Sequence, residues 1–441
     1  MEATAQSVED FLIDGLSFKL RPGASYITNR RSVSYFPQGG NQYSPNGVKV
    51  IRIMLTGDQW VDPSTIRVMF NLVNDGTANQ LLYPVSGPWC FFRRLRVLCG
   101  GQLLEDIDYY NRVHEMFHNF QSTYTRRNDN TEGFLADQYN LSTNYLTTTA
   151  GASIAGAGGY MTVAFRPLSG LINQDKMLPI RYAPITLEFE VANNYSDCII
   201  VPASPTSATA NDFTPTNTSS TWEIQQFQIK CDVCTLDNAL DNEYAQHLMS
   251  GKSLPINFAT YVTQLQSITS NSAVSINVQR AFTRLKSVFV SLVNSAALTT
   301  GVRKEFNFFY NPSYLAASPY DSSKDVQFQM QIGSKLFPEY PIWSTQESFY
   351  QLRKCLGVQA STFHSIDISP IEYRKTKYIV GIDTEKVLSA GFTGLNTKSG
   401  DLMTIKFNRM PIDVTAPDKM YVILHADMIM NIRDSGVEVF E

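Results

Sequence analysis

The stretch PWCFFRRLRVLCGGQLLEDIDYYNRVHEMF, residues 88–117, decides the fold. Its first part, residues 89–98, is rich in aromatic and aliphatic side chains and predicts a β-strand. Gly100 and Gly101 then predict a turn. The spacing of apolar residues over 107–120 predicts a helix. Strand, glycine turn and aromatic helix form a pattern that can be sought elsewhere in the chain.

The same pattern recurs in the second half. MQIGSKLFPEY (330–340) is followed by ESFYQLRKCL (347–356), which predicts a strand, a glycine turn and a helix over 345–356. A second pair of segments, 168–191 and 392–408, shares a small residue, Gly-Leu, a polar stretch and an alternating strand. The offsets are 232 residues from Gly101 to Gly333 and 224 residues from Gly170 to Gly394. Two similar offsets predict that two halves of one fold arose by duplication.

Short apolar runs, several of which alternate with polar residues, dominate the remaining sequence and predict strands with one buried face. An all-β fold with few short helices and long loops follows. The expected strands are residues 48–55, 66–73, 89–98, 161–165, 185–191, 222–233, 274–278, 285–293, 306–310, 326–332, 378–382, 402–407 and 420–432.

The segment LDNALDNEYAQHLMSG (236–251) separates the two halves. Asp237 can cap a helix, Leu240, Tyr244 and Leu248 recur at helical spacing, and Gly251 ends it. The predicted organisation is an amino-terminal arm (1–14), a first β domain (15–237), a linker helix (238–253) and a second β domain (254–441). Residues 121–159 and 202–221 are expected to be long loops, which in compact domains are usually functional or disordered.

Charge and composition limit the classes of function. The 441 residues include 36 Lys and Arg against 40 Asp and Glu, for a net charge of -4. Specific nucleic-acid binding is not expected, because phosphate binding needs a concentrated basic surface. Only 17% of residues are charged, below the ~25% that is usual. A polar but weakly charged surface suits contacts between like subunits.

Several features bear on the cellular compartment. Residues 1–14 are acidic and lack the features of a secretory signal. No segment approaches the ~18 consecutive apolar residues of a membrane-spanning helix. The six cysteines are too sparse for a disulfide scaffold and fit a reducing compartment. The glycosylation sequons at Asn140, Asn194 and Asn217 are therefore interpreted as polar loop residues.

Three segments together resemble a known family. Residues 88–117, TLDNALDNEYAQHLMSGKSLPI (235–256) and YIVGIDTEKVLSAGFTGLNTKSGDLMTIKF (378–407) are similar to major capsid proteins of the double jelly-roll type. The resemblance is to those of polinton-like viruses, virophages and adintoviruses. It spans most of the chain in the correct order, and it implies two tandem eight-stranded jelly rolls.

The resemblance also implies a function and partners. The expected protein is a non-enzymatic major capsid protein whose homotrimer forms a pseudo-hexagonal capsomer of an icosahedral shell, with no catalytic residue, cofactor or metal. Expected partners are neighbouring capsomers and minor capsid (penton) proteins. The arm with Val8, Phe11 and Leu12 would lie beneath the shell, against inner proteins or an internal membrane. Such a protein belongs to the virion and is made in the host cytoplasm. The 22 Tyr, 26 Phe and 13 Met fit large subunit interfaces.

The alternative from another class is a zinc metalloprotease. His114, Glu115 and His118 form a literal H-E-x-x-H on the expected helix, where two imidazoles could bind zinc and the carboxylate could act as a base. The metzincin continuation fails, since Gln121 stands where glycine is required. Glu132 or Asp137 would have to supply the third ligand. An apolar stripe of Tyr109, Val113, Phe117 and Phe120 instead favours a surface or interface helix.

Other constellations are weak. Cys231 and Cys234 form one C-x-x-C with His247 as the nearest further ligand, but residues three apart on a strand point to opposite faces. They are therefore interpreted as reduced structural thiols. The basic clusters Arg93, Arg94, Arg96 and Arg126, Arg127 are expected to face carboxylates of neighbouring subunits. Neither a phosphate-binding glycine loop nor G-x-S-x-G occurs. A glycan-binding β protein remains a further alternative, suggested by the polar loops and the aromatic content.

Overall fold

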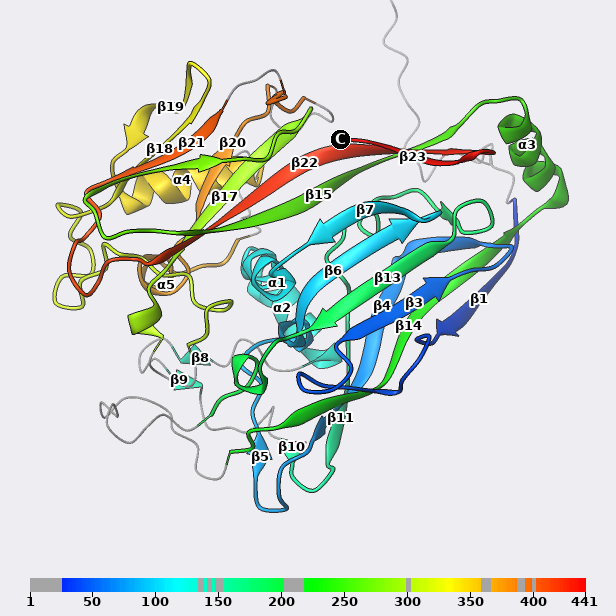
Figure 1. Ribbon diagram of the computed structural model, residues 1–441, viewed down its shortest axis with the longest axis horizontal. Coiled ribbons are helices and arrows are strands. Elements are labelled where there is room, and N and C mark those ends of the chain that lie inside the picture. The colour runs from blue at the N-terminus through cyan, green and yellow to red at the C-terminus, as the bar shows by residue number, and fades with distance from the viewer. Residues whose placement is uncertain are drawn as a thin grey trace, which may run out of the picture.

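A computed structural model describes residues 26–133, 139–140, 145–146, 154–201, 218–298, 303–357, 366–386, 393–398 and 402–441. Strands form most of the regular structure, and two pairs of facing antiparallel sheets lie side by side (Figure 1). Within these ranges no helix has the length and apolar character needed to cross a membrane. The expected amino-terminal arm and most of the expected loop at 202–221 lie outside the described residues.

The first half forms one jelly roll. Its eight main strands, numbered 1 to 8 along the chain, form two sheets. One sheet has the strand order 1-8-3-6 and the other has the order 2-7-4-5. These two orders are the double Greek key of this fold. The first sheet contains β1 (Ile27–Tyr35), β14 (Trp222–Leu236), β4 (Trp60–Asn74) and β11 (Tyr160–Phe165), with β2 (Gln42–Tyr43) and β12 (Leu178–Pro179) beside them; the second contains β3 (Val50–Leu55), β13 (Ile185–Val191), β6 (Phe92–Cys99) and β7 (Gln102–Ile107).

The second half repeats this topology. Its eight main strands show the same two orders, so the prediction that both halves share one strand order is confirmed. One sheet contains β15 (Leu254–Ser267), β22 (Lys419–Arg433), β17 (Leu285–Val293) and β20 (Val380–Asp383), with β23 (Gly436–Phe440) on β22; the other contains β16 (Ala273–Val278), β21 (Met403–Asn408), β18 (Gln327–Ile332) and β19 (Lys335–Ile342).

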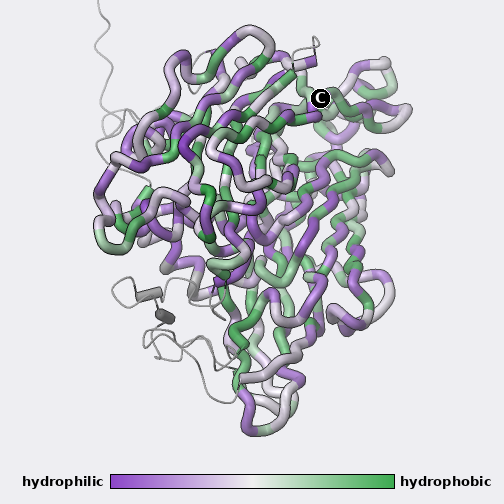
Figure 2. Tube along the Cα trace, turned by 60° about the vertical axis from the view of Figure 1, so that its left-hand side comes forward, coloured by the Kyte–Doolittle hydropathy of each residue, from purple (hydrophilic) through white to green (hydrophobic). Residues whose placement is uncertain are grey.

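Alternation of side chains builds the core of each roll. In β13, Leu187, Phe189 and Val191 are fully buried, while Glu188 and Glu190 lie on the other face and are half-buried. The tube in Figure 2 shows the same exchange of hydrophobic and hydrophilic residues along many strands. Each roll therefore encloses an apolar layer between its two sheets.

Helices occur at corresponding places in the two rolls. α1 (Tyr110–Asn119) follows β7, and α4 (Thr345–Cys355) follows β19, as the repeated pattern predicts. α3 (Asn238–Met249) joins β14 to β15, and Gly251, with a φ of 79°, follows its end. The remaining short elements are α2 (Thr123–Glu132), α5 (Pro370–Lys375), β5 (Leu81–Leu82), β8 (Tyr139–Asn140), β9 (Tyr145–Leu146), β10 (Ile154–Ala155), and the 3-10 turns η2 (Pro88–Phe91), η3 (Tyr195–Asp197) and η4 (Ser295–Ala297).

Four expectations about local structure are wrong. The helix predicted from residue 107 begins at Tyr110, because β7 first pairs with β6 across the Gly100–Gly101 turn. The strand predicted from residue 89 begins at Phe92, because η2 precedes it. α2 is a helix within the predicted loop at 121–159. Residues 306–310 make only isolated bridges, to Leu292 and Lys377, and do not form a strand.

Candidate functional site

The HEMFH motif lies on α1 and surrounds the indole of Trp89. The imidazole of His114 stacks on this indole with ring centroids 4.2 Å apart, and the ring of His118 lies 4.5 Å from it. Glu115 accepts a 2.8 Å hydrogen bond from Trp89 Nε1 and another from the Ser86 hydroxyl. The polar residues of the motif therefore pack around one buried aromatic ring.

This geometry does not support the zinc hypothesis. Burial lowers the pKa of His114 to about 4 and the pKa of His118 well below its usual value, so both imidazoles are neutral at pH 7 and their protonation does not decide the question. His114 Nε2 lies 3.2 Å from the carbonyl oxygen of Arg166, which can only accept, so this nitrogen carries the proton and is not a free ligand. Glu132 pairs with Arg67 at 3.2 Å, and Asp137 lies outside the described residues. In the described ranges, no three His, Cys, Asp or Glu residues are placed to hold a metal ion.

α1 instead lies at the junction between the two rolls (Figure 1). The ring of Phe117 lies 4.6 Å from Tyr261 of β15 and 5.4 Å from Phe289 of β17. Phe120 lies 5.9 Å from Phe289. The apolar stripe of the helix thus contacts the second roll, while its histidines contact the first. The helix belongs to an interface, but that interface is within the chain.

Arg112 is the most constrained charged residue of this junction. Its side chain is fully buried, and its guanidinium donates to Ser291 Oγ at 3.0 and 3.3 Å and to the Phe308 carbonyl at 3.4 Å. The same group lies over the rings of Tyr421, at 4.4 Å, and Phe309, at 4.7 Å. Burial lowers the pKa of Arg112 to about 10, so the residue remains charged at neutral pH. One cation of the first roll is therefore held entirely by groups of the second.

Glu105 of β7 organises a second part of the junction. The buried carboxylate accepts hydrogen bonds from the Ser169 hydroxyl, from Gly170 N at 2.8 Å and from Leu171 N at 3.3 Å. Burial raises the pKa of Glu105, and these hydrogen bonds oppose the shift. A Cβ on Gly170 would lie 1.7 Å from the Ala259 carbonyl oxygen of β15, so only glycine allows this approach between the rolls.

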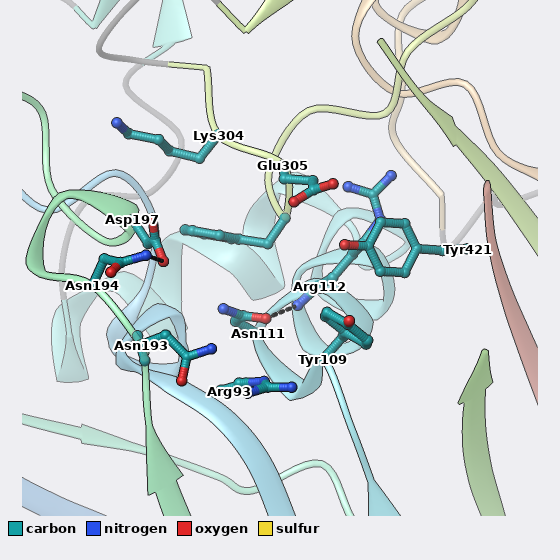
Figure 3. Close-up of a pocket in the computed structure, with 12 residues that line it drawn as sticks. Arg93, Tyr109, Asn111, Arg112, Asn193, Asn194, Asp197, Lys304, Glu305 and Tyr421 are labelled. Carbon is teal, nitrogen blue, oxygen red and sulfur yellow. Dashed lines mark hydrogen bonds between the residues drawn. The ribbon is translucent and has the colours of Figure 1, made fainter. Parts of the chain in front are cut away.

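A polar cleft of about 290 Å³ opens at the same junction (Figure 3). Two of its charged residues have ion-pair partners: Arg93 lies 3.6 Å from Asp108, and Glu305 lies 2.8 Å from Lys419. Charged residues of both signs line the cleft, which fits a polar seam between packed units better than a site for one kind of ion. The side chains drawn around it in Figure 3 include Arg93, Tyr109, Asn111, Arg112, Asn193, Asn194, Asp197, Lys304, Glu305 and Tyr421.

The C-x-x-C pair is divided between two faces of β14. Cys231 belongs to the core of the first roll, and its pKa is raised to about 12 by burial. Cys234 lies beside Trp60 in the sheet register, on the face where Trp60 packs against Tyr244 of α3. His247 Nε2 lies 3.4 Å from the Ser253 carbonyl oxygen instead of near the thiols. The geometry is that of two separate structural cysteines.

The arginines of β6 form ion pairs with carboxylates of the same chain. Arg94 makes a two-pronged pair with Asp106 of β7, at 2.6 and 2.7 Å, and Arg96 lies 3.0 Å from Glu188 of β13. Cross-strand carboxylates therefore pair with these arginines within the chain. Contact of this cluster with neighbouring subunits stays a prediction. Arg126 is buried and donates to the Asp367 carbonyl at 3.4 Å, and the side chain of Arg127 lies outside the described residues.

Of the three sequons, only Asn194 has a described side chain. It is exposed, precedes η3 and donates to Asp197 Oδ2 at 3.3 Å, as a polar loop residue does. The residues that matter most at the junction, Arg112, Glu105 and Gly170, were not predicted as a group. Their signal in the sequence is faint: Arg112 and Glu105 flank the turn into α1, and Gly170 belongs to the repeated Gly-Leu motif.

Two complete jelly rolls in one chain define a double jelly-roll fold. Solved structures with this arrangement include the PBCV-1 VP54 crystal structure fitted into a cryo-EM reconstruction of the virophage Sputnik. That likeness has a TM-score of 0.62 at 11% identity and covers 96% of this chain and 98% of the other. The 3.5 Å cryo-EM structure of Sputnik virophage matches with a TM-score of 0.60 at 8% identity, covering 97% and 91%. The Faustovirus major capsid protein matches at 0.55 with 8% identity, covering 95% and 93%.

No protein-family model and no curated protein sequence matches this chain. The likeness therefore lies in the fold, at identities of 8 to 11%, and it extends over almost the whole chain.

Proposed function

We propose that the protein is a non-enzymatic major capsid protein that builds an icosahedral viral shell. The observation that carries this proposal is the pair of tandem jelly rolls with one strand order, aligned over nearly their full length with viral capsid structures. The HEMFH motif, the one feature that favoured an enzyme, is a packing cluster around Trp89.

The proposed capsomer is a homotrimer. Two similar rolls in each chain give three chains six similar units, so a threefold oligomer can occupy a pseudo-hexagonal position in a shell. Stable interfaces of this kind need ~2,000 Å² or more of buried surface. A chain with 17% charged and 12% aromatic residues is suited to such interfaces.

The remaining parts of the proposal follow from this role. The units would be an arm (1–14), the first roll (15–237), a linker helix (238–253) and the second roll (254–441). Neighbouring capsomers and minor (penton) capsid proteins would be partners, and the arm would meet inner proteins or an internal membrane. The protein would be made in the host cytoplasm and reside in the virion.

Mass and shape of the purified protein test the proposal. Light scattering after size exclusion should give about three times 49.5 kDa at micromolar concentration. Negative-stain images of the same fraction should show particles with threefold outlines, alone or in arrays. A stable monomer or dimer would count heavily against a capsid role.

A further inference from the structure

We propose that Lys286 and Asp427 of the second roll become joined by an amide bond within the chain, with Glu385 carrying the proton. The bond links Lys286 Nζ, on β17, to the side-chain carboxyl carbon of Asp427, on β22, and releases one water molecule. β22 and β17 are the two central strands of the order β15-β22-β17-β20. The inference concerns a single chain and goes beyond the proposed role in a shell.

Lys286 lies between two carboxyl groups that different strands supply. Its Nζ lies 3.4 Å from Glu385 Oε1, just after β20, and 3.7 Å from Asp427 Oδ1; these are the positions of the unlinked side chains. The side chain of Lys286 is 25% exposed, while those of Glu385 and Asp427 are 11% and 7% exposed. An amine, a carboxyl group and a second carboxylate are therefore held together in a largely buried place, which favours their reaction.

Hydrogen bonds of the backbone fix the positions of these groups. Lys286 is the extra residue of a β-bulge where β17 pairs with β22, and such bulges redirect side chains. The Asp427 N–H donates to the Arg284 carbonyl at 3.0 Å, and the Thr384 N–H, next to Glu385, donates to the Lys286 carbonyl at 2.9 Å. The backbone beside each carboxyl group is thus tied to the backbone around the lysine, which holds the reacting groups close.

Asp427 has the properties of the group that is attacked. Burial raises the pKa of this carboxyl group and Glu385 adds to the shift, while the charges of Lys286 and Arg284 oppose it. Its Oδ2 atom is buried and has no hydrogen-bond partner among the described residues. A protonated carboxyl group accepts an amine more readily than a carboxylate does, because it carries no negative charge. Asp427 is therefore the electrophile, and Glu385 is the carboxylate that moves the proton.

The reaction balances with the groups at hand. Glu385 takes one proton from the Lys286 ammonium, and the free amine attacks the carboxyl carbon of protonated Asp427. A nitrogen–carbon bond forms, and the bond between that carbon and its hydroxyl oxygen breaks. The hydroxyl leaves as water with a second proton from the nitrogen, and the third hydrogen stays on the amide. Glu385 then returns its proton to solvent. Burial limits the access of water and so opposes hydrolysis.

Another buried pair shows what an ordinary ion pair looks like in this chain. Lys377 Nζ lies 3.3 Å from Glu372 Oε1, and the two side chains are 16% and 14% exposed. Burial raises the pKa of Glu372, but Lys377 and hydrogen bonds from Ser369 outweigh it, so the net pKa is lowered. An ionised carboxylate is a poor electrophile. This pair has the distance and burial of the proposed site without its chemistry, and it should stay unlinked.

The bond would restrain the second roll in a way that thiols do not. Lys286 and Asp427 are 141 residues apart in the sequence, and a covalent link that closes a long loop restricts the unfolded chain. All six cysteines are free thiols. Unlike a disulfide, an amide bond is not opened by a reducing compartment. On a denaturing gel the linked wild type should migrate faster than Lys286→Arg, because the closed loop keeps the unfolded chain more compact.

Mass spectrometry of the full-length protein, denatured, tests the bond. The wild type should be lighter than its sequence by one water molecule. Trypsin should release a branched peptide that joins residues 285–303 to residues 420–433, because it does not cut after an acylated lysine. Lys286→Arg keeps the positive charge but lacks the nucleophile, and Glu385→Gln lacks the proton carrier. Both variants should have the unmodified mass of their sequences.

Lys377→Arg is the matched control and should keep both the water loss and the branched peptide. All three variants should elute from size exclusion as the wild type does, which separates loss of the bond from loss of the fold. A wild type of unmodified mass, fresh and after prolonged incubation at neutral pH, would overturn the proposal. So would a water loss that persists in Lys286→Arg. A branched peptide that persists in Glu385→Gln would overturn the role of Glu385. None of these readings depends on assembly, so the proposed function is tested separately.

Discussion

Arg112 shows how much of the junction rests on one side chain. Replacing it with alanine removes the donor for Ser291 and the Phe308 carbonyl and leaves space beneath Tyr421. We expect Arg112→Ala to lower the free energy of unfolding by about 2–4 kcal/mol, the range for losing buried hydrogen bonds and packing together. Chemical denaturation followed by tryptophan fluorescence measures this change.

Arg94→Ala is the matched control for that experiment. Arg94 also has a short two-pronged partner in Asp106, but both side chains are about one-third exposed. Ion pairs at such positions contribute about 1 kcal/mol or less. Equal losses for the two arginines would mean that Arg112 does not hold the rolls together.

The HEMFH residues lead to a prediction about metal content. Elemental analysis of the purified protein should find no stoichiometric zinc, because His114 and His118 pack on Trp89 and no third ligand accompanies them in the described residues. The double variant His114→Ala with His118→Ala should still assemble, although lost packing will lower its melting temperature. One zinc per chain that disappears in this variant would revive the protease hypothesis.

At the scale of elements, the buried histidines on both sides of the junction make stability depend on pH. Burial lowers the pKa of His425, on β22, to about 3 and the pKa of His114, on α1, to about 4. The unfolded chain binds these protons near pH 6.5. Protonation therefore favours the unfolded state, and stability present at neutral pH is lost as the pH falls from about 6.5 towards these values. At pH 5 each such histidine lowers the free energy of unfolding by about 2 kcal/mol relative to neutral pH.

His425→Phe isolates one of these contributions. The ring can keep its stacking on Tyr261, 4.9 Å away, while the contact of His425 with Ser287 is lost. The variant should lose about 2 kcal/mol less stability than the wild type between pH 7.5 and pH 5. Denaturation midpoints at the two pH values supply the comparison.

Buried carboxyl groups change folding stability with pH in the direction opposite to that of the buried histidines. The net slope of stability against pH therefore includes both kinds of group. Burial raises the pKa of Glu105 and of Asp427. Each binds its proton more readily in the folded state, so each contributes stability that increases as the pH falls. The contribution of His425 is therefore read from the difference in pH dependence between the variant and the wild type. The pH dependence of wild-type stability alone does not isolate it.

The strands that were predicted from the sequence and the strands that were missed lie in different surroundings. Strands such as β13 and β14, which face one core and one polar side, alternate clearly and were predicted. The fifth and first strands of each roll were missed, namely β7, β19, β1 and β15. β7 and β15 meet another roll, so their outward residues are not simply polar, and β1 is exposed over most of its length. Their pairing depends on distant segments, which local periodicity does not record.

The candidate site was harder to derive for a related reason. HEMFH was visible as a motif, but its surroundings depend on Trp89 and Arg166, which no spacing rule connects to it. The Gly-Leu motif was recognised as a repeat, but the structural reason why glycine is needed differs between its two copies. Gly170 approaches β15 of the other roll, whereas a Cβ on Gly394 would meet the backbone of Arg284 and Leu285 in its own roll.

At the scale of the whole molecule, the two rolls depend on each other unequally. The outer side of the second roll includes Phe289 and Tyr421, which α1 and its neighbours bury. The corresponding side of the first roll carries polar residues, and within the described part of the chain β1 is exposed over most of its length there. A free second roll would expose a contiguous apolar surface, which soluble monomers rarely do.

Cutting the chain after Gly251 therefore gives the last prediction. The 1–251 and 252–441 fragments, co-expressed with a tag on the first only, should co-purify in a 1:1 ratio, because the α1 junction joins them without the peptide link. The second fragment alone should aggregate. Phe117→Asp in the first fragment should abolish co-purification, since the carboxylate would be buried against Tyr261 and Phe289. Tyr124→Asp, at a position 80% exposed on α2, is the control and should change nothing. A second fragment that is a stable, cooperatively melting monomer would contradict the view that the junction is an essential part of its fold.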